Sequence, residues 1–207
     1  MLLNDRQIRE RCFGLTQMLK PFSEAVSGGG VVSYGLSHAG YDLRLGPEIL
    51  AFKATFCDAI DPKLFSGALY QRRVFDKLFY SKGFSLPDED GHPYTEMDGN
   101  RVLIPAGGYI LGRSYEYIQI PADIKGRCVG KSTYARCGIV VNTTPLEPGW
   151  CGHLTIEIGN ITPCPAVVYV MEGIAQLEFD RIEPPEKDYA GKKYQGQSAT
   201  PVPARIL

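Results

Sequence analysis

The sequence predicts a single all-β domain, and three observations support this fold class. The chain has 207 residues, which suits one domain, and its 44% apolar content allows a normal hydrophobic core. Its 23 glycines and 15 prolines interrupt short apolar runs, a pattern typical of β-barrels and β-sandwiches. Within 153–158, apolar Leu154, Ile156 and Ile158 alternate with polar residues, as in a strand with one buried face.

The runs that fit strands are short and are bounded by glycine, proline or charged residues. In chain order they are 31–34, 41–45, 49–53, 101–104, 109–111, 115–120, 138–141, 153–158, 167–171 and 174–179.

A helix is clearly signalled at the N-terminus. Asn4 can cap it, and Gln7 stands three residues later, as in a capping box. Leu3 and Ile8 are spaced to pack on one another across the first turn. We expect the helix to end at Gly14.

Charge and cysteine spacing limit the classes of partner and compartment. The net charge of −1 gives no electrostatic reason to expect nucleic-acid or membrane binding. Charged residues such as Asp5, Arg6 and Arg9 interrupt the first segment, so it does not fit a signal peptide, and no run approaches a membrane span. The six cysteines have no CxxC spacing, which favours reduced thiols. We therefore expect a cytoplasmic protein.

The most informative segment is 130–160, GKSTYARCGIVVNTTPLEPGWCGHLTIEIGN. Lys131 and Arg136 supply cations, and Ser132 and Thr133 supply hydroxyls, which together suit phosphate oxygens. Glu157 is a lone carboxylate in an otherwise neutral strand. The combination predicts a nucleotide site that contains a proton-transfer group.

This segment resembles the core of dCTP deaminases, the trimeric relatives of dUTPase. Two further motifs resemble the same family in the same order: 33–37 (SYGLS) with 40–44 (GYDLR), and 191–197 (GKKYQGQ). The resemblance implies that 1–207 form one distorted β-barrel of the dUTPase type with short helices. It also implies a homotrimer with sites at subunit interfaces. The implied reaction is the hydrolysis of dCTP to dUTP and ammonia, which supplies dUTP for dUMP and thymidylate synthesis.

The resemblance assigns the catalytic roles to three residues. Glu157 activates the water that attacks C4 of cytosine and then passes a proton to the ring. Burial that raises its pKa toward neutrality would let this carboxylate act first as a base and then as an acid. Ser132 holds the attacking water at the substrate, and Arg136 pairs with Glu157 and opposes the effect of burial on its pKa.

The resemblance also implies substrate contacts near this core. Lys131 and Thr133 contact the triphosphate. A backbone carbonyl near Thr144 binds the catalytic water, and Glu147 contacts the 3′-hydroxyl of the deoxyribose. For Trp150, core packing and ligand contact both stay open, with packing favoured.

The C-terminal motif implies a mobile arm, 188–207, that closes over the nucleotide. Its polar, glycine-rich composition fits such an arm. By resemblance, Lys193 grips phosphate and Gln197 reads the cytosine edge, for which an amide offers both a donor and an acceptor. Tyr189 is the candidate for a phosphate-contacting tyrosine.

The sequence carries no zinc signature. Zinc-dependent deaminases use His-x-Glu with a distant Pro-Cys-x-x-Cys, and none of His38, His92 and His153 is followed by x-Glu. The spacing of Cys151 and His153 is a weak metal signal on its own. We therefore expect no zinc and no metal bound by the protein itself, with Mg²⁺ bound through the triphosphate.

Two alternative functions stay open. A bifunctional relative would continue from dUTP to dUMP and pyrophosphate. A non-catalytic regulatory nucleotide binder is less favoured, because Ser132, Arg136 and Glu157 occur together. The family also makes dTTP a possible feedback inhibitor.

Two further expectations concern structure. Residues 64–100 lie outside the resemblance and read as an insertion, and the apolar spacing within 64–80 fits a surface helix. Asp42 and Arg44 are expected to form a polar pair that fixes the early strand.

Overall fold

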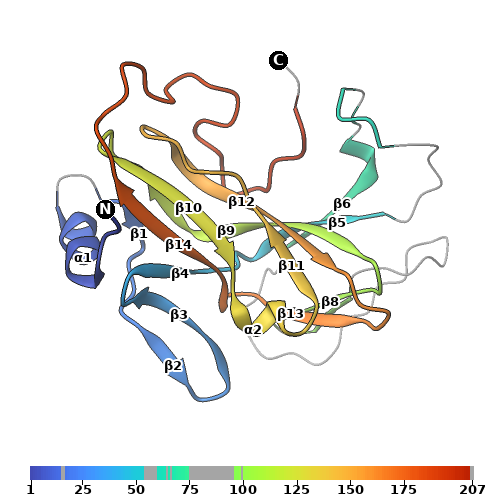
Figure 1. Cartoon of the computed structure of the whole chain (residues 1–207). Coiled ribbons are helices and arrows are strands. Elements are labelled where there is room, and N and C mark those ends of the chain that lie inside the picture. Colours follow the sequence, from blue (N-terminus) through green and yellow to red (C-terminus); the bar gives the residue numbers. More distant parts are fainter. Residues whose placement is uncertain are drawn as a thin grey trace.

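The computed structural model describes residues 1–14, 17–53, 60–63, 65, 67–74, 96–98 and 100–205. In this part of the chain β-strands predominate and the helices are short, which confirms the predicted all-β class (Figure 1). The helices are α1 (Asp5–Phe13), α2 (Ser132–Ala135) and the 3₁₀ turn η1 (Gly67–Leu69). The described strands form three separate hydrogen-bonded sheets rather than one closed barrel.

The largest sheet has six strands and carries Glu157. Its strand order is β11 (Ile139–Asn142), β12 (Cys151–Asn160), β9 (Tyr109–Gln119), β5 (Glu48–Phe52) and β6 (Tyr70–Val74), with β1 (Leu19–Lys20) paired to β9. The continuous strand β9 spans two runs that the sequence predicted separately. Gly112 and Arg113 join these runs because β12 pairs with them opposite Ile156 and Thr155.

The second sheet has five antiparallel strands. Its order is β10 (Ile124–Gly130), β14 (Gly173–Arg181), β4 (Gly40–Arg44), β3 (Val31–Ser37) and β2 (Val26–Gly28). The sequence did not predict β10. Its buried face consists of Ile124, Gly126 and Cys128, and a glycine between two basic residues gives little apolar periodicity to detect.

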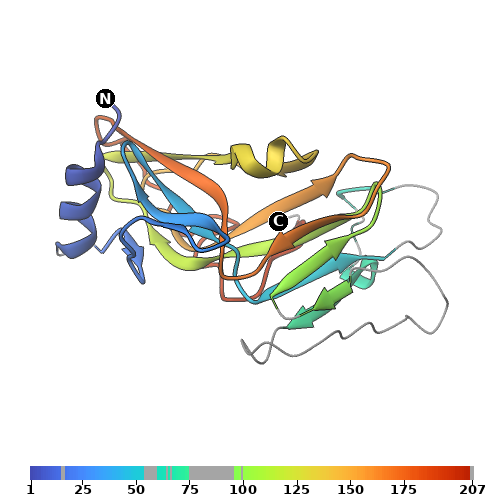
Figure 2. The ribbon, with the colours of Figure 1, turned by 90° about the horizontal axis from the view of Figure 1, so that it is seen from below.

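A third, three-stranded sheet completes the fold, in the order β13 (Ala166–Tyr169), β8 (Arg101–Ile104) and β7 (Glu96–Asp98). Figure 2 shows it at the end of the molecule that lies away from α1.

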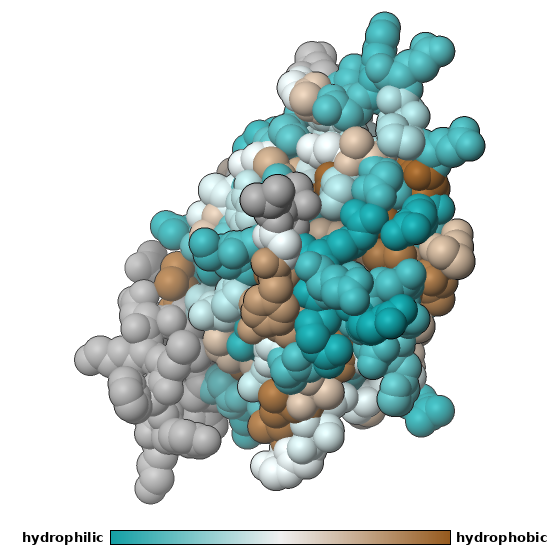
Figure 3. All heavy atoms as spheres, turned by 90° about the vertical axis from the view of Figure 1, so that its left-hand side faces the viewer, coloured by the Kyte–Doolittle hydropathy of each residue, from teal (hydrophilic) through white to brown (hydrophobic). Residues whose placement is uncertain are grey.

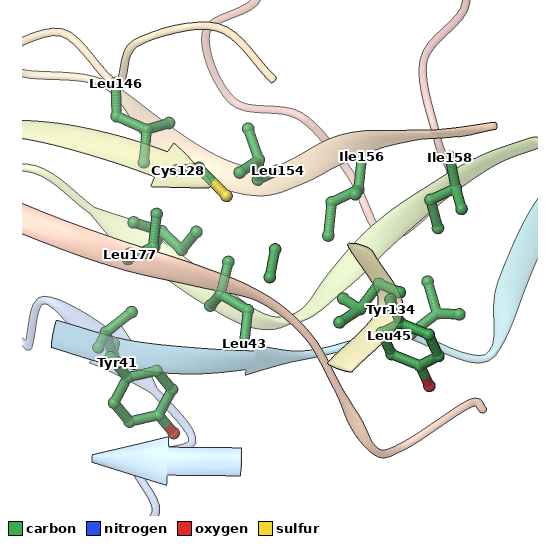
Figure 4. Packing of buried hydrophobic residues seen from close by; sticks show 14 of the residues in the cluster. Tyr41, Leu43, Leu45, Cys128, Tyr134, Leu146, Leu154, Ile156, Ile158 and Leu177 are labelled. Carbon is green, nitrogen blue, oxygen red and sulfur yellow. The ribbon is translucent and has the colours of Figure 1, made fainter. Parts of the chain in front are cut away.

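The hydrophobic core lies between the two larger sheets. In Figure 4, Leu154, Ile156 and Ile158 point from β12 toward the side of the core that holds Leu43 and Leu177. All five side chains are buried, and each full burial contributes about 1.5–3 kcal/mol. The predicted alternation of β12 is confirmed, because its apolar residues face this core and Glu157 faces the other way.

The N-terminal helix α1 forms as predicted. The Asn4 side chain accepts from the Gln7 backbone N–H at 3.0 Å, and the Gln7 side chain accepts from the Asn4 backbone N–H at 3.0 Å. Ile8 and Cys12 are its buried residues, and Gly14 is its C-cap. The local sequence therefore determines this helix.

The predicted surface helix within 64–80 is wrong in its described part. Strand β6 occupies Tyr70–Val74 there and pairs with β5, from Phe52↔Tyr70 to Glu48↔Val74. The open edge of β5 offers backbone donors and acceptors, and pairing with them satisfies groups that a short isolated helix would leave to water. The rest of the predicted insertion 64–100, apart from 65, 67–69, 96–98 and 100, lies outside the described residues.

In the described residues, none of the helices has the length and apolar character that crossing a membrane requires. The face shown in Figure 3 is largely hydrophilic where it is coloured, and its apolar side chains form small separate patches.

Candidate functional site

A cavity of about 620 Å³ opens between β12, the turn 144–150 and the C-terminal segment 189–204. This volume is in the range of about 300–1,000 Å³ that is usual for small-molecule sites. Side chains from β5, β6 and β9, together with Ile60, Pro62 and Phe65, form further parts of its walls. The residues predicted for the site that line it are Thr144, Glu147, Trp150, Glu157, Tyr189 and Gln197.

Glu157 lies in this cavity on β12, in register with Asn142 of β11 and Leu111 of β9. Its Oε2 atom is buried and has no hydrogen-bond partner among the described residues. Burial raises the pKa of Glu157 to about 7, and a hydrogen bond from its own backbone N–H lowers the pKa only in part. A carboxyl group with this pKa can gain and lose a proton near neutral pH.

An aromatic wall stands beside Glu157. Phe52 of β5 makes T-shaped contacts with Tyr70 of β6 at 5.5 Å and with Tyr109 of β9 at 6.5 Å between ring centroids. Burial, and then the nearby charge of Glu157, raises the pKa of Tyr70 to about 12 and raises the pKa of Tyr109 as well. Both phenols therefore stay protonated near neutral pH. The sequence did not single out these tyrosines, because only the pairing of β5, β6 and β9 brings them to Glu157.

The turn 144–150 forms one rim of the cavity. The Glu147 carboxylate lies 3.5 Å from the Lys125 ammonium group and is partly exposed. Trp150 is only 4% exposed, and its indole N–H donates to the backbone carbonyl of Tyr194 at 2.8 Å. Trp150 therefore packs in the core, as favoured, and also holds the C-terminal arm.

The C-terminal arm is docked on the edge of β12 in this structure. Gly196 N–H donates to the carbonyl of Cys151, and His153 N–H donates to the carbonyl of Gln197, both at 2.9 Å. Gly152 lies between these contacts with φ 143°, and a Cβ atom there would lie 2.6 Å from the backbone nitrogen of Gln197. Only glycine lets the arm approach β12 this closely. Tyr194, another lining residue, enters the site through this docking.

Thr155 links the arm to the floor of the cavity. Its hydroxyl donates to the Gln197 side-chain oxygen at 2.6 Å and accepts from the Val202 backbone N–H at 3.0 Å. No sequence motif singles out Thr155. The signal that could have found it is its place on β12, on the same face as Glu157 and two residues before it.

The cationic half of the predicted site lies outside this cavity. Ser132, Thr133 and Arg136 are exposed on and after α2, and none of them lines the cavity within a single chain. In Figure 1, α2 lies at the lower end of the molecule and the C-terminal arm at the upper end. Lys131 precedes α2, and its ammonium group donates to Asp42 Oδ2 at 2.5 Å. Arg136 and Glu157 are therefore not paired within the chain.

The expected pair of Asp42 and Arg44 is wrong. Asp42 binds Lys131, and Arg44 donates through Nε to Glu116 at 2.7 Å, where the glutamate is fully buried. The Arg44 guanidinium group also lies over the rings of Tyr34 at 5.0 Å and Tyr115 at 4.6 Å. Neighbouring elements supply each strand residue with a partner that sequence spacing does not show.

Lys193 lies on the arm but is not among the cavity-lining residues, and its ammonium group is 5.1 Å from the centre of the Tyr194 ring. On β12, His153 Nδ1 lies 3.1 Å from the carbonyl oxygen of Ser114. Burial, and then the charge of Arg113, lowers the pKa of His153. In the described part of the chain, no three His, Cys, Asp or Glu side chains gather as a metal-binding group.

The arrangement suits one kind of chemistry. Flat aromatic and apolar walls can enclose a planar ring, and the Gln197 amide can hydrogen-bond to its edge. The unpartnered oxygen of Glu157 can take a proton from water beside that ring.

Comparison with known proteins gives consistent matches over nearly the whole chain. The family model described as dCTP deaminase-like matches residues 2–182. A dCTP deaminase from Campylobacter fetus subsp. fetus is 43% identical over 209 residues, covering 100% of this chain and 98% of the relative. A dCTP deaminase from Acidobacterium capsulatum is also 43% identical, and the alignment covers 97% of each chain.

The fold also resembles a solved structure. The crystal structure of 2′-deoxycytidine 5′-triphosphate deaminase from Agrobacterium tumefaciens matches with a TM-score of 0.53 at 22% identity. The match covers 88% of this chain and 48% of that chain, and it shows similarity of fold.

Proposed function

The chain belongs to the dCTP deaminase-like family, and from this premise we propose that it hydrolyses dCTP to dUTP and ammonia. The observation that carries the proposal is Glu157, a carboxylate inside the cavity with an unpartnered oxygen and a pKa raised to about 7. A group with this pKa can act as base and as acid in one cycle near neutral pH.

In the proposed reaction, Glu157 takes a proton from the attacking water while the water oxygen forms a bond to C4 of cytosine. The carboxyl group then returns this proton to N3 of the ring. The second proton of the water leaves with the 4-amino group, so the C4–N4 bond breaks and ammonia departs. A carbonyl near Thr144 at the cavity rim and the hydroxyl of Ser132 would hold the water for attack.

We propose that the complete site forms between subunits of a homotrimer. The support is the separation within one chain, since Glu157 lines the cavity whereas Ser132 and Arg136 are exposed beyond it. A head-to-tail ring of three subunits would bring the α2 segment of one subunit to the cavity of the next. Arg136 would then pair with Glu157 and lower its pKa, against the effect of burial.

The remaining predicted residues would bind the nucleotide. Lys131 and Thr133 would reach the triphosphate from the neighbouring subunit, and Lys193 and Tyr189 from the arm. Glu147 would bind the 3′-hydroxyl of the deoxyribose. This contact would require its carboxylate to exchange the present Lys125 partner for the sugar.

Mg²⁺ would arrive on the triphosphate. Glu147 and Glu157 are the carboxylates that line the cavity within the described residues, too few for an all-protein magnesium cage. Phosphate oxygens and water would supply its other ligands. The bound ion would neutralise phosphate charge, while the protein positions the base.

The bifunctional alternative depends on whether the Glu147 carboxylate can activate a second water. Hydrolysis of dUTP needs a second carboxylate aligned with water at the α-phosphate. Pro145 and Pro148 flank Glu147, and their fixed φ angles restrict how its carboxylate can be aimed. A misplacement of about 1 Å can reduce a rate on the order of 10²-fold, so we favour the deaminase without this second step.

The test is to incubate the purified protein with dCTP and Mg²⁺ and to resolve dUTP, dUMP, ammonia and pyrophosphate. We expect dUTP and ammonia in equal amounts, without pyrophosphate. Pyrophosphate released at the rate of ammonia would establish the bifunctional reaction instead. Binding of dCTP without any ammonia would favour a regulatory nucleotide binder, and dTTP added to the same assay tests feedback inhibition.

A further inference from the structure

We propose that Thr155 is a specificity-determining positioning residue, which fixes the Gln197 amide so that its NH₂ group faces the base and selects cytosine over uracil. This inference rests on the proposed function, because it concerns how the same cavity would recognise its nucleotide.

The first observation is a chain of hydrogen bonds that runs through the Thr155 hydroxyl. Thr155 lies on β12 with 8% of its surface exposed. The Val202 backbone N–H lies 3.0 Å from Thr155 Oγ1, and this Oγ1 lies 2.6 Å from Gln197 Oε1. The chain therefore joins β12 to two separate points of the C-terminal arm.

The chemistry of these groups sets the direction of each hydrogen bond. A backbone N–H can only donate, so Val202 requires Thr155 Oγ1 to accept. The one hydroxyl proton is then free to donate, and it points to Gln197 Oε1. If the amide were reversed, its NH₂ group would donate to the hydroxyl oxygen, and the hydroxyl proton would lose the acceptor that it has here, Gln197 Oε1.

The Gln197 main chain is fixed as well. His153 N–H donates to its carbonyl at 2.9 Å, and Gln197 forms a parallel bridge with Gly152. The Gln197 side chain lines the cavity. Among the described residues, its NH₂ group has no hydrogen-bond acceptor, whereas its oxygen is engaged by Thr155. Gln197 therefore presents its NH₂ group, a hydrogen-bond donor, to the cavity.

A fixed donor discriminates between the two bases at N3. Cytosine presents N3 as an acceptor, so an NH₂ group placed at N3 can bind it, whereas O2 is an acceptor in both bases and does not distinguish them. In uracil N3 carries a hydrogen, so a donor would face a donor there. The hydroxyl of Thr155 thus turns a glutamine, which could serve either base, into a group that favours cytosine.

The NH₂ group of Gln197, held as a donor at N3, also affects product release. Deamination places a proton on N3, so the contact that holds the substrate becomes unfavourable once the product has formed. The Val202 contact connects this effect to the arm, because the chain of hydrogen bonds is complete only when the segment beyond Gln197 is docked.

The test compares Thr155→Val, which keeps the shape but removes the hydroxyl, with Thr155→Ser, which keeps the hydroxyl. Both are made in the full-length protein with Glu157→Gln, so that equilibrium binding of dCTP and of dUTP is measured without turnover. We expect Thr155→Val to reduce the preference for dCTP over dUTP by about tenfold, the effect of one hydrogen bond. Thr155→Ser should keep the preference of the parent.

A second variant guards against loss of folding in Thr155→Val. Val202→Pro removes the backbone N–H that orients the hydroxyl but leaves Thr155 in place, and it should lower the preference in the same direction. Equal weakening of dCTP and dUTP in these variants would mean that Thr155 only docks the arm, and would overturn the inference. An unchanged preference would overturn it too.

The proposed function is judged separately, from the protein with native Glu157. If that protein releases no ammonia from dCTP, the proposed function fails. If it does release ammonia while Thr155→Val keeps the preference for dCTP, the inference alone fails.

Discussion

The surroundings of Glu157 give its carboxyl group a pKa that an ordinary glutamate does not have. An ordinary glutamate is ionised at neutral pH, with a pKa of about 4.3. Burial against the aromatic wall raises the pKa of Glu157 to about 7, and no cation within the described residues of the chain opposes this. The proposed Arg136 from a neighbouring subunit would oppose it, so the working pKa of the site reflects both effects.

Replacement of Glu157 by glutamine tests its role directly. Glu157→Gln keeps the shape of the side chain but cannot accept a proton, and general acid–base catalysis is typically worth about 10²–10⁴-fold. We expect kcat to fall by at least the upper end of this range, while dCTP binding persists. Ammonia release and equilibrium binding measure the two effects. Near-native turnover would refute the assignment.

The pH profile tests the contribution of Arg136. Glu157 must be ionised to accept a proton, so kcat/KM should fall as pH drops below its pKa. Arg136→Gln removes the cation that lowers this pKa and leaves the effect of burial, so the acidic limb should move up toward about pH 7. Arg136→Lys keeps the charge and should leave the limb closer to its original position. A limb that stays fixed in Arg136→Gln would show that the two residues do not pair.

At the scale of elements, β12 organises the site. Ile156 and Ile158 anchor one face of the strand in the core, and this fixes the opposite face, where Thr155 and Glu157 lie. Near the N-terminal end of β12, Gly152 lets the backbone of the arm pair with the backbone of the strand. One strand therefore positions the carboxylate, the threonine hydroxyl and the arm together.

Removal of the arm should abolish activity but not folding. Truncation after Asp188 deletes Tyr194 and Gln197, whereas the buried core lies almost wholly before this point. It also uncovers Trp150, the only tryptophan of the chain, whose indole N–H donates to the arm. We expect little ammonia release and a shift of tryptophan emission to longer wavelength.

A matched control is truncation after Arg205, which keeps all of these contacts. It should retain both the emission and the activity. If the longer truncation turned over dCTP normally, the arm would be only a tail.

At the scale of the whole molecule, Glu157 lines the cavity, whereas Ser132 and Arg136 are exposed outside it. This separation is the reason for proposing a site that two subunits share. Mixed assemblies of Glu157→Gln and Ser132→Ala subunits test the proposed trimer and whether its sites are shared. Each variant alone should be almost inactive. In a ring with shared sites, about a quarter of the sites in an equal mixture would combine the native Glu157 of one subunit with the native Ser132 of the next.

We therefore expect reassembly of the two inactive proteins to restore roughly this fraction of the wild-type rate of ammonia release. A mixture of two separately tagged Glu157→Gln preparations is the control and should stay inactive. No recovery in trimers that have demonstrably exchanged subunits would mean that each subunit carries its own complete site.

The activity of the whole molecule should not depend on zinc. We expect deamination to survive treatment with a zinc-selective chelator once Mg²⁺ is restored, because Glu157 would activate the water. The measurement is ammonia release alongside the zinc content of the protein. Stoichiometric zinc, with activity lost on its removal, would contradict this prediction.

Sequence by itself determined the features that depend on short-range physics. The capping box of Asn4 and Gln7 predicted α1, because its bonds join residues three positions apart. The alternation along β12 predicted which face Glu157 occupies, because side chains alternate along any strand. The order of three motifs also led to the family, and through it to the residues of the cavity rim and the arm.

Tertiary structure alone decided which distant residues meet. Pairing along β5 made Tyr70–Val74 a strand, against the helical spacing of apolar residues across 64–80, and so brought Tyr70 to Glu157. Asp42 binds Lys131 rather than its neighbour Arg44, and Thr155 binds Gln197 across the arm. These contacts join segments far apart in the chain, and their free energy comes from burial and from hydrogen bonds that exist only when the sheets have assembled. The periodicity of a short segment therefore cannot predict these contacts.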